Sequence, residues 1–243
     1  MDQIRDSSVN PVRDLWHEGP LAVLDLETTG TDPATARIVE LSFLLVDPDG
    51  KVEPLVDTLV NPGIPIPPEA SAVSGITTAD LIRDGRDPGP VLNETVSSLG
   101  RVVEGGVPIL IFNATYDWPL LGFEFARLGC PALPDVPPAI LVDPLVLDRH
   151  CDRYRRGKRD LASMAIHYGV DLKNAHRAGG DAMATVEVAR AMVARYGSIL
   201  DLDGPGLVKL QKQAHERWRV SFNEYLVSRG EERRLVTEVW PGV

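Results

Sequence analysis

Cysteine, long apolar runs and positive charge are all scarce in this chain of 243 residues. Its two cysteines, Cys130 and Cys151, provide neither a disulfide framework nor a close pair of metal-binding thiolates. No apolar run reaches the length that crosses a membrane, and no secretory signal peptide is visible. We therefore expect a protein of the reducing cytoplasm with no membrane partner.

The shortage of positive charge argues at first against a nucleic-acid ligand. The chain has 25 Lys and Arg residues against 35 Asp and Glu residues, a formal net charge of −10, whereas phosphate binding normally recruits cations. The imbalance belongs to residues 1–100, which hold 6 basic and 17 acidic side chains. Residues 101–243 hold 19 and 18, so this part of the chain remains compatible with a phosphate-bearing ligand.

Six cations gather in the segment 149–159, where Asp152 is the single acidic residue and Tyr154 is interleaved. Two interpretations are open. The segment is either a flap that faces nucleic acid or a solvated loop between a strand and a helix, which is what charge runs usually mean. The cations are Arg149, Arg153, Arg155, Arg156, Lys158 and Arg159.

Two carboxylates follow the first apolar run of the chain. Residues 21–24 are all apolar and predict a buried strand that ends in a turn at about 29–33. Side chains alternate along a strand, so Asp25 and Glu27 share one face. Burying one polar group without a partner costs about 2–7 kcal/mol, and two carboxylates on one face also repel each other. A cation is therefore needed to neutralise them. Oxygen ligands of this kind suit Mg²⁺ or Mn²⁺.

Two further carboxylates and one imidazole occupy comparable positions. Asp117 follows the apolar run 108–112, near the start of a helix predicted over 116–128. Asp181 lies in the first turn of an amphipathic helix, and His176 precedes it on a loop that we expect Gly179 and Gly180 to make mobile. Each residue alone could be a helix cap or an exposed side chain. Their conjunction indicates a divalent-metal site with a base beside it.

Three motifs give the chain a family resemblance over about residues 20–198. It resembles the DEDDh 3′-to-5′ exonucleases, whose motifs read Asp-x-Glu-Thr-Thr-Gly, His-Asn-Ala-x-Phe-Asp and His-x-Ala-x-x-Asp. The chain departs from the common pattern with Phe112, Tyr116 and Ser74, and we expect the first two to have little chemical effect. The matching blocks are Asp25-Leu26-Glu27-Thr28-Thr29-Gly30, Asn113-Ala114-Thr115-Tyr116-Asp117 and His176-Arg177-Ala178-Gly179-Gly180-Asp181.

The resemblance implies a metal-assisted reaction. Two divalent ions, Mg²⁺ or Mn²⁺, would be held by four carboxylates, and His176 would take a proton from the attacking water. It also implies that Thr28, Thr29 and Asn113 contact the terminal nucleotide, although the two threonines could equally serve to shape the turn. The implied metal ligands are Asp25, Glu27, Asp117 and Asp181.

The fold class is predicted to be α/β. Apolar runs indicate strands near 21–26, 37–47, 51–60, 108–112 and 139–142, and the sequence 47–50 indicates a hairpin turn. The resemblance implies a ribonuclease H-like fold, with a mixed five-stranded sheet flanked by helices. We divide the chain into an N-terminal extension (1–19), an exonuclease domain (20–198) and a C-terminal helix and tail (199–243), with the helix over 207–228.

The function implied is 3′-to-5′ hydrolysis of single-stranded or frayed DNA, in repair or polymerase proofreading, with release of nucleoside 5′-monophosphates. A DNA polymerase is then a candidate partner. One alternative keeps the chemistry and changes the substrate to RNA; the first and third motifs resemble the proofreading branch more. Another is a catalytically silent nucleic-acid-binding module, against which the five intact acidic and histidine residues speak.

Overall fold

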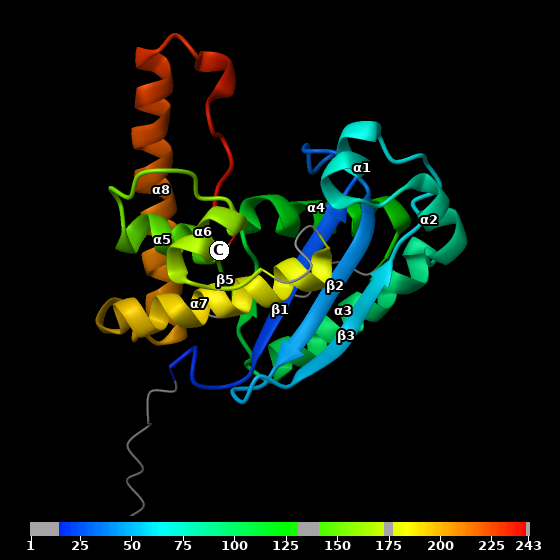
Figure 1. The fold of residues 1–243 in the computed structure, drawn as a ribbon, viewed down its shortest axis with the longest axis horizontal. Coiled ribbons are helices and arrows are strands. Elements are labelled where there is room, and N and C mark those ends of the chain that lie inside the picture. The colour runs from blue at the N-terminus through cyan, green and yellow to red at the C-terminus, as the bar shows by residue number, and fades with distance from the viewer. Residues whose placement is uncertain (1–14, 131–140, 173–176, 242–243) are drawn as a thin grey trace, which may run out of the picture.

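A computed structural model describes residues 15–130, 141–172 and 177–241 (Figure 1). Its centre is a five-stranded sheet of order β3-β2-β1-β4-β5. The first three strands pair antiparallel, and β4 and β5 continue the sheet in parallel with β1. The predicted mixed five-stranded sheet is thereby confirmed. The strands are β1 (Leu21–Thr28), β2 (Ile38–Val46), β3 (Val52–Leu59), β4 (Ile109–Leu110) and β5 (Leu141–Val142).

The hairpin between β2 and β3 forms where the sequence predicts it. Gly50 adopts a positive φ of 82° and donates its N–H to the Asp47 carbonyl at 2.9 Å. Glycine is the residue that takes this backbone conformation without strain. Outermost in the sheet, β3 tolerates Pro54, because an edge strand does not need every N–H for pairing.

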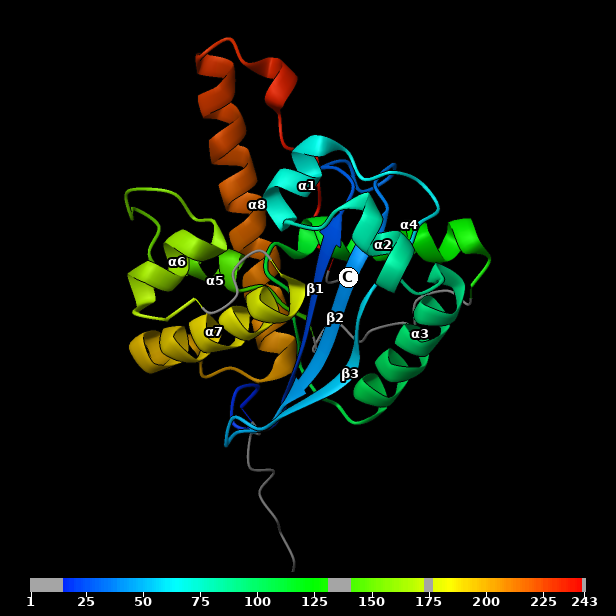
Figure 2. The same ribbon diagram turned by 45° about the vertical axis from the view of Figure 1, so that its right-hand side comes forward.

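Helices cover both faces of the sheet (Figures 1 and 2). On one face, Ala22 and Leu24 of β1 pack in a core with α3 and α4; on the other, Leu21 and Val23 pack in a core with α7. The helices are α1 (Pro68–Ser74), α2 (Thr78–Asp84), α3 (Pro88–Glu104), α4 (Ala114–Leu128), α5 (Pro144–Cys151), α6 (Leu161–Tyr168), α7 (Ala178–Leu200) and α8 (Gly204–Ser228), with a 3₁₀ turn at Glu232–Arg234.

The predicted loop at Gly179 and Gly180 is wrong, because α7 already begins at Ala178 and includes both glycines. A buried carboxylate from β2 explains the early start. Glu40 accepts hydrogen bonds from the backbone N–H of Ala178 at 3.0 Å and from Arg177 Nε at 2.9 Å. A carboxylate at a helix N-terminus satisfies a free N–H group and complements the helix dipole.

The C-terminal helix α8 stands beside the β5 edge of the sheet (Figure 1). Buried Gln211 fixes it there: its Oε1 accepts from the Asp143 N–H at 2.7 Å, and its Nε2 donates to the Leu141 carbonyl at 3.0 Å. At the other end of the chain, Trp16 is buried and donates its Nε1–H to the Leu200 carbonyl. The proposed division at residues 20 and 198 stays a prediction. Within the described ranges, no helix combines the length and apolarity needed to cross a membrane.

Candidate active site

The carboxylates predicted on β1 point toward α7. Leu21 and Val23 face the α7 side of the sheet, and Asp25 and Glu27 continue that alternation. Asp181, in the first turn of α7, lies on the same side of the sheet. One carboxylate oxygen from each of the three lies within 4.8 Å of the others, an arrangement that can hold a metal ion. The structure thus places three of the four predicted metal ligands close enough to bind one ion.

Asp117, the fourth predicted ligand, lies buried in the first turn of α4. Burial raises its pKa well above the usual range, and the negative charges of Asp143 and Glu27 raise it further, whereas a local backbone hydrogen bond lowers it. In turn, Asp117 is the carboxylate that raises the pKa of Asp25 most. Its charge therefore acts on the same cluster.

The turn that places Asp117 depends on Asn113 and Asp143. Asn113 takes a left-handed conformation with φ of 63°, which asparagine tolerates better than most residues. The Asp143 carboxylate accepts from the backbone N–H groups of Asn113 and Ala114, at 3.1 and 3.0 Å. It also caps α5 by accepting from the Leu145 N–H. The contact between Asn113 and a nucleotide stays a prediction.

Electrostatics inside the cluster favour a bound cation. Burial raises the pKa of Asp25 well above its usual value, and repulsion from Asp117, Asp181 and Glu27 adds to the effect. Burial, with Asp181 and Glu40, raises the pKa of Glu27 to about 7, while Arg177 opposes the rise. A divalent cation would remove this repulsion, and a set of carboxylate oxygens is the donor set that Mg²⁺ and Mn²⁺ prefer.

Glu40 is a residue of the site that we did not predict. It lies opposite Glu27 in the β1–β2 register, and it orients the start of α7, and therefore Asp181, through Arg177 and Ala178. A signal was present in the sequence, because Glu40 is the only charged residue of β2. A buried charge there needs a partner, yet the sequence does not say which one.

The threonine hydroxyls at the end of β1 hold the following turn together. Thr29 Oγ1 accepts from the Arg37 N–H at 2.9 Å, and Thr28 Oγ1 donates to the Gly30 carbonyl at 2.8 Å. The Tyr116 hydroxyl lies 2.7 Å from Thr28 Oγ1 and donates to the Gly30 carbonyl. Tyr116 therefore ties α4 to this turn, a link that a phenylalanine could not make. Contacts of Thr28 and Thr29 with substrate stay predictions.

The predicted base, His176, lies outside the described residues, so its relation to the carboxylates stays a prediction. The next residue, Arg177, immediately precedes α7 and donates a hydrogen bond to Glu40.

A cleft of about 530 Å³ opens beside the acidic cluster. Asp25 and Asp181 line it together with Asn113, and two arginines from the segment 149–159 reach it as well, Arg149 and Arg159. Part of that segment has a structural role. The buried Asp148 carboxylate pairs with Arg159 and with Arg155 at 3.2 Å. Neither of the two simple interpretations, flap or solvated loop, describes the whole segment.

Comparisons with known proteins identify relatives of this chain. The chain is 30% identical over 177 residues to the DNA polymerase III subunit epsilon of Treponema pallidum, covering 71% of this chain and 75% of that subunit. It is 31% identical to a putative bifunctional exonuclease/endonuclease protein of Mycobacterium tuberculosis, of which it covers only 27%.

The fold is similar to that of exonuclease I of E. coli, solved in complex with a dA16 oligonucleotide. The TM-score is 0.64 at 22% identity, and the match covers 75% of this chain and 42% of exonuclease I. This likeness extends to the fold alone. A family model described as exonuclease (RNase_T) matches residues 22–189, most of the chain, and the protein therefore belongs to this exonuclease family.

Proposed function

We propose that this protein is a metal-dependent 3′-to-5′ exonuclease that shortens single-stranded or frayed DNA in repair or polymerase proofreading. The observation that carries the proposal is the convergence of Asp25, Glu27 and Asp181 within 4.8 Å. A binding module would have no use for buried carboxylates that repel each other. The epsilon subunit and the oligonucleotide complex of exonuclease I favour DNA over RNA as the substrate.

The residues of the chain divide the chemical work. Asp25, Glu27, Asp117 and Asp181 would hold two divalent ions, Mg²⁺ or Mn²⁺. When bound, such ions stabilise charge on the phosphodiester oxygens and make a water more acidic. His176 accepts the proton of the attacking water, which its ordinary pKa near ~6.5 permits at neutral pH. The leaving group is the 3′ oxygen of the shortened strand, so the released product is a nucleoside 5′-monophosphate.

The test is digestion of matched 5′-labelled DNA and RNA oligonucleotides with Mg²⁺ or Mn²⁺, with an EDTA control. We expect a ladder that shortens from the 3′ end, abolished by EDTA and reduced by orders of magnitude in Asp25→Asn and His176→Ala. Asp49→Asn is the matched control, because Asp49 is exposed in the β2–β3 turn and the same charge is removed.

Three results would overturn parts of the proposal. Faster shortening of the RNA strand would identify an exoribonuclease. Early release of the 5′ label would show that hydrolysis proceeds from the 5′ end. An absence of cleavage with either metal, while both strands are bound, would identify the silent binding module.

A further inference from the structure

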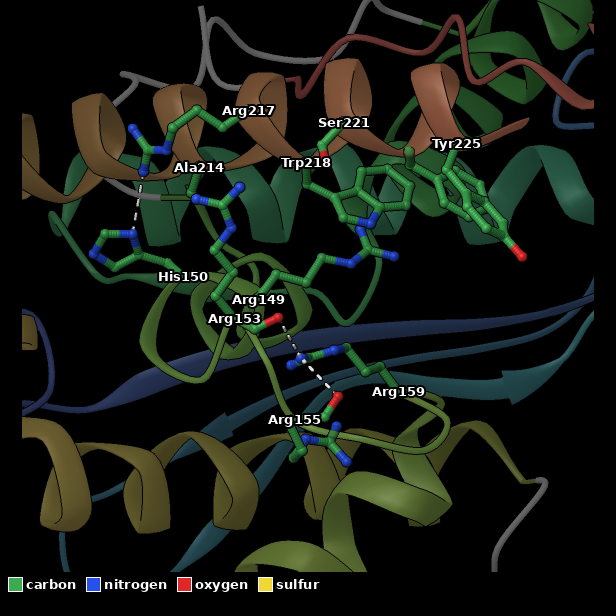
Figure 3. Close-up of a pocket in the computed structure, with 11 residues that line it drawn as sticks. Arg149, His150, Arg153, Arg155, Arg159, Ala214, Arg217, Trp218, Ser221 and Tyr225 are labelled. Atoms are coloured by element: carbon green, nitrogen blue, oxygen red, sulfur yellow. Dashed lines mark hydrogen bonds between the residues drawn. The ribbon is translucent and has the colours of Figure 1, made fainter. Parts of the chain in front are cut away.

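A second pocket, of about 330 Å³, lies between α8 and the segment that joins α5 to α6 (Figure 3). Its wall carries five arginines and an aromatic row, and within the described parts of the chain no carboxylate lines it. This is unusual in a protein with a net charge of −10. The arginines are Arg149, Arg153, Arg155, Arg159 and Arg217.

The aromatic row follows one face of α8. The rings of Trp218 and Phe222 are stacked, with centroids 5.4 Å apart and an interplanar angle of 12°. Tyr225 continues the stack, 6.3 Å from Phe222 at 23°. Tyr225 is 55% exposed, so the row ends in an accessible ring. A flat base can extend such a stack, since every nucleobase has a π-face.

The pocket has more positive than negative charge around it. Among the described residues, Asp148 is the only carboxylate at ion-pair distance from the five arginines, and it engages Arg155 and Arg159. Arg155 is 8% exposed, yet its Nε has no hydrogen-bond partner within the described chain. The Arg149 guanidinium lies 3.5 Å from the centre of the Trp218 ring. Burial, with repulsion from Arg159, lowers the pKa of Arg149 to about 10, although Asp143 and Asp148 oppose the fall. A phosphate would relieve this crowding.

The pocket adjoins the cleft at the acidic cluster. Arg149 and Arg159 line both, whereas Asp25 and Asp181 line only the cleft. A strand whose 3′ end lies at the carboxylates would therefore pass these two arginines before it reached α8. This adjacency favours a polynucleotide over an acidic peptide, which would have no reason to approach the acidic cluster.

We propose that the pocket is a subsite for the upstream part of a single-stranded DNA substrate, with phosphates on the arginines and a base stacked on the α8 aromatic row. The inference rests on the proposed function, because that function places the 3′ end in the cleft. In this proposal α8 helps to hold the substrate, and the pocket provides a local phosphate-binding site in a protein of negative net charge.

The experiment measures fluorescence anisotropy of 5′-labelled dT2 and dT8 whose 3′-terminal linkages are phosphorothioates, in Mg²⁺, with the full chain. Wild type should bind dT8 more tightly than dT2. Tyr225→Leu should weaken binding of dT8 by about 5- to 150-fold, the range for loss of one base stack. Trp218→Leu should weaken it as well, because the Trp218 ring holds Phe222 and the Arg149 guanidinium in place. Tyr225→Leu and Arg153→Gln alter exposed side chains and test the same pocket without risk to the core.

Arg153→Gln should also reduce the slope of log affinity against log salt by about 0.7, the value for one phosphate contact on a single strand. The matched control is Arg219→Gln. Arg219 lies on α8, beside the aromatic row, but pairs with Glu216 and does not line the pocket. Its loss should change neither binding nor the slope.

The outcomes separate the two proposals. If wild type cleaves DNA but the pocket variants bind dT8 as well as Arg219→Gln does, the subsite is wrong and the exonuclease stands. If wild type cleaves neither strand, the proposed function has failed. A labelled peptide of four glutamates and one phenylalanine tests the other occupant: if Trp218→Leu weakens its binding and leaves dT8 binding intact, the pocket serves a protein partner.

Discussion

At the scale of single residues, Tyr116 shows how a small departure from a family pattern acquires a role. A phenylalanine is common at this position in the family that the chain resembles. Here the hydroxyl reaches both Thr28 and the Gly30 carbonyl, immediately after the two β1 carboxylates. The ring packs against the core on the α4 side of the sheet. The hydroxyl therefore adds a polar link between two elements of the candidate site.

Tyr116→Phe removes that link and keeps the ring. We expect a loss of about 0.5–1.5 kcal/mol in the free energy of unfolding, because one net hydrogen bond is lost at a partly buried site. Urea unfolding measures it. Exonuclease activity should survive, since phenylalanine is the common residue of the family. Tyr154→Phe is the control, because Tyr154 is exposed and should give no change; equal stabilities of the two variants would contradict the role of the Tyr116 hydroxyl.

At the scale of elements, sequence predicts strands better than helix starts. The first three strands were predicted to within a residue or two at each end, because apolar residues mark β1 and β2 and a turn with a required glycine separates β2 from β3. The start of α7 was wrong because Gly179 and Gly180 favour a loop locally. The interaction that decides it comes from Glu40, far away in the sequence. Local pattern cannot supply such a partner.

The Asp143 side chain joins two helices, and its removal should cost more than that of an ordinary helix cap. It caps α5 and accepts from the two N–H groups that begin α4. We expect Asp143→Ala to lower the free energy of unfolding by about 2–5 kcal/mol, since it leaves buried donors unpaired. Asp160→Ala removes the exposed cap of α6 and should cost about 1 kcal/mol. Similar losses in chemical denaturation would show that Asp143 is only a cap.

At the scale of the whole molecule, the predicted residues assemble, but the surfaces around them could not be predicted. Asp25, Glu27 and Asp181 converge because a buried strand and a helix start meet at one sheet face. The second pocket requires Arg149 and Trp218 to come together from α5 and α8. The sequence of neither segment indicates that the two are in contact. Sequence therefore predicts the carboxylates of the cluster, whereas the second pocket is visible only in the tertiary structure.

We expect the acidic cluster to make the stability of the whole molecule depend on pH and on metal. The pKa values of Asp25, Asp117 and Glu27 are raised on folding, that of Glu27 from 4.5 to about 7. Such groups stabilise the metal-free fold fully below their unfolded pKa values, and this contribution is lost as the pH rises through the folded values. Without metal, the melting temperature should fall between about pH 4.5 and at least pH 7.

Divalent cations should reverse this trend, because they bind the carboxylates that the rising pH deprotonates. At a Mg²⁺ or Mn²⁺ concentration of about 100 times Kd, the stabilisation is about 2.7 kcal/mol, or a rise of about 5–11 °C for a chain of this size. Scanning calorimetry at pH 5, 6, 7 and 8, with EDTA or metal, measures both effects. Asp25→Asn combined with Asp181→Asn should flatten the EDTA curve and abolish the metal response, whereas Asp49→Asn should retain both. A melting temperature that follows the same pH curve with and without metal would mean that the cluster binds no cation.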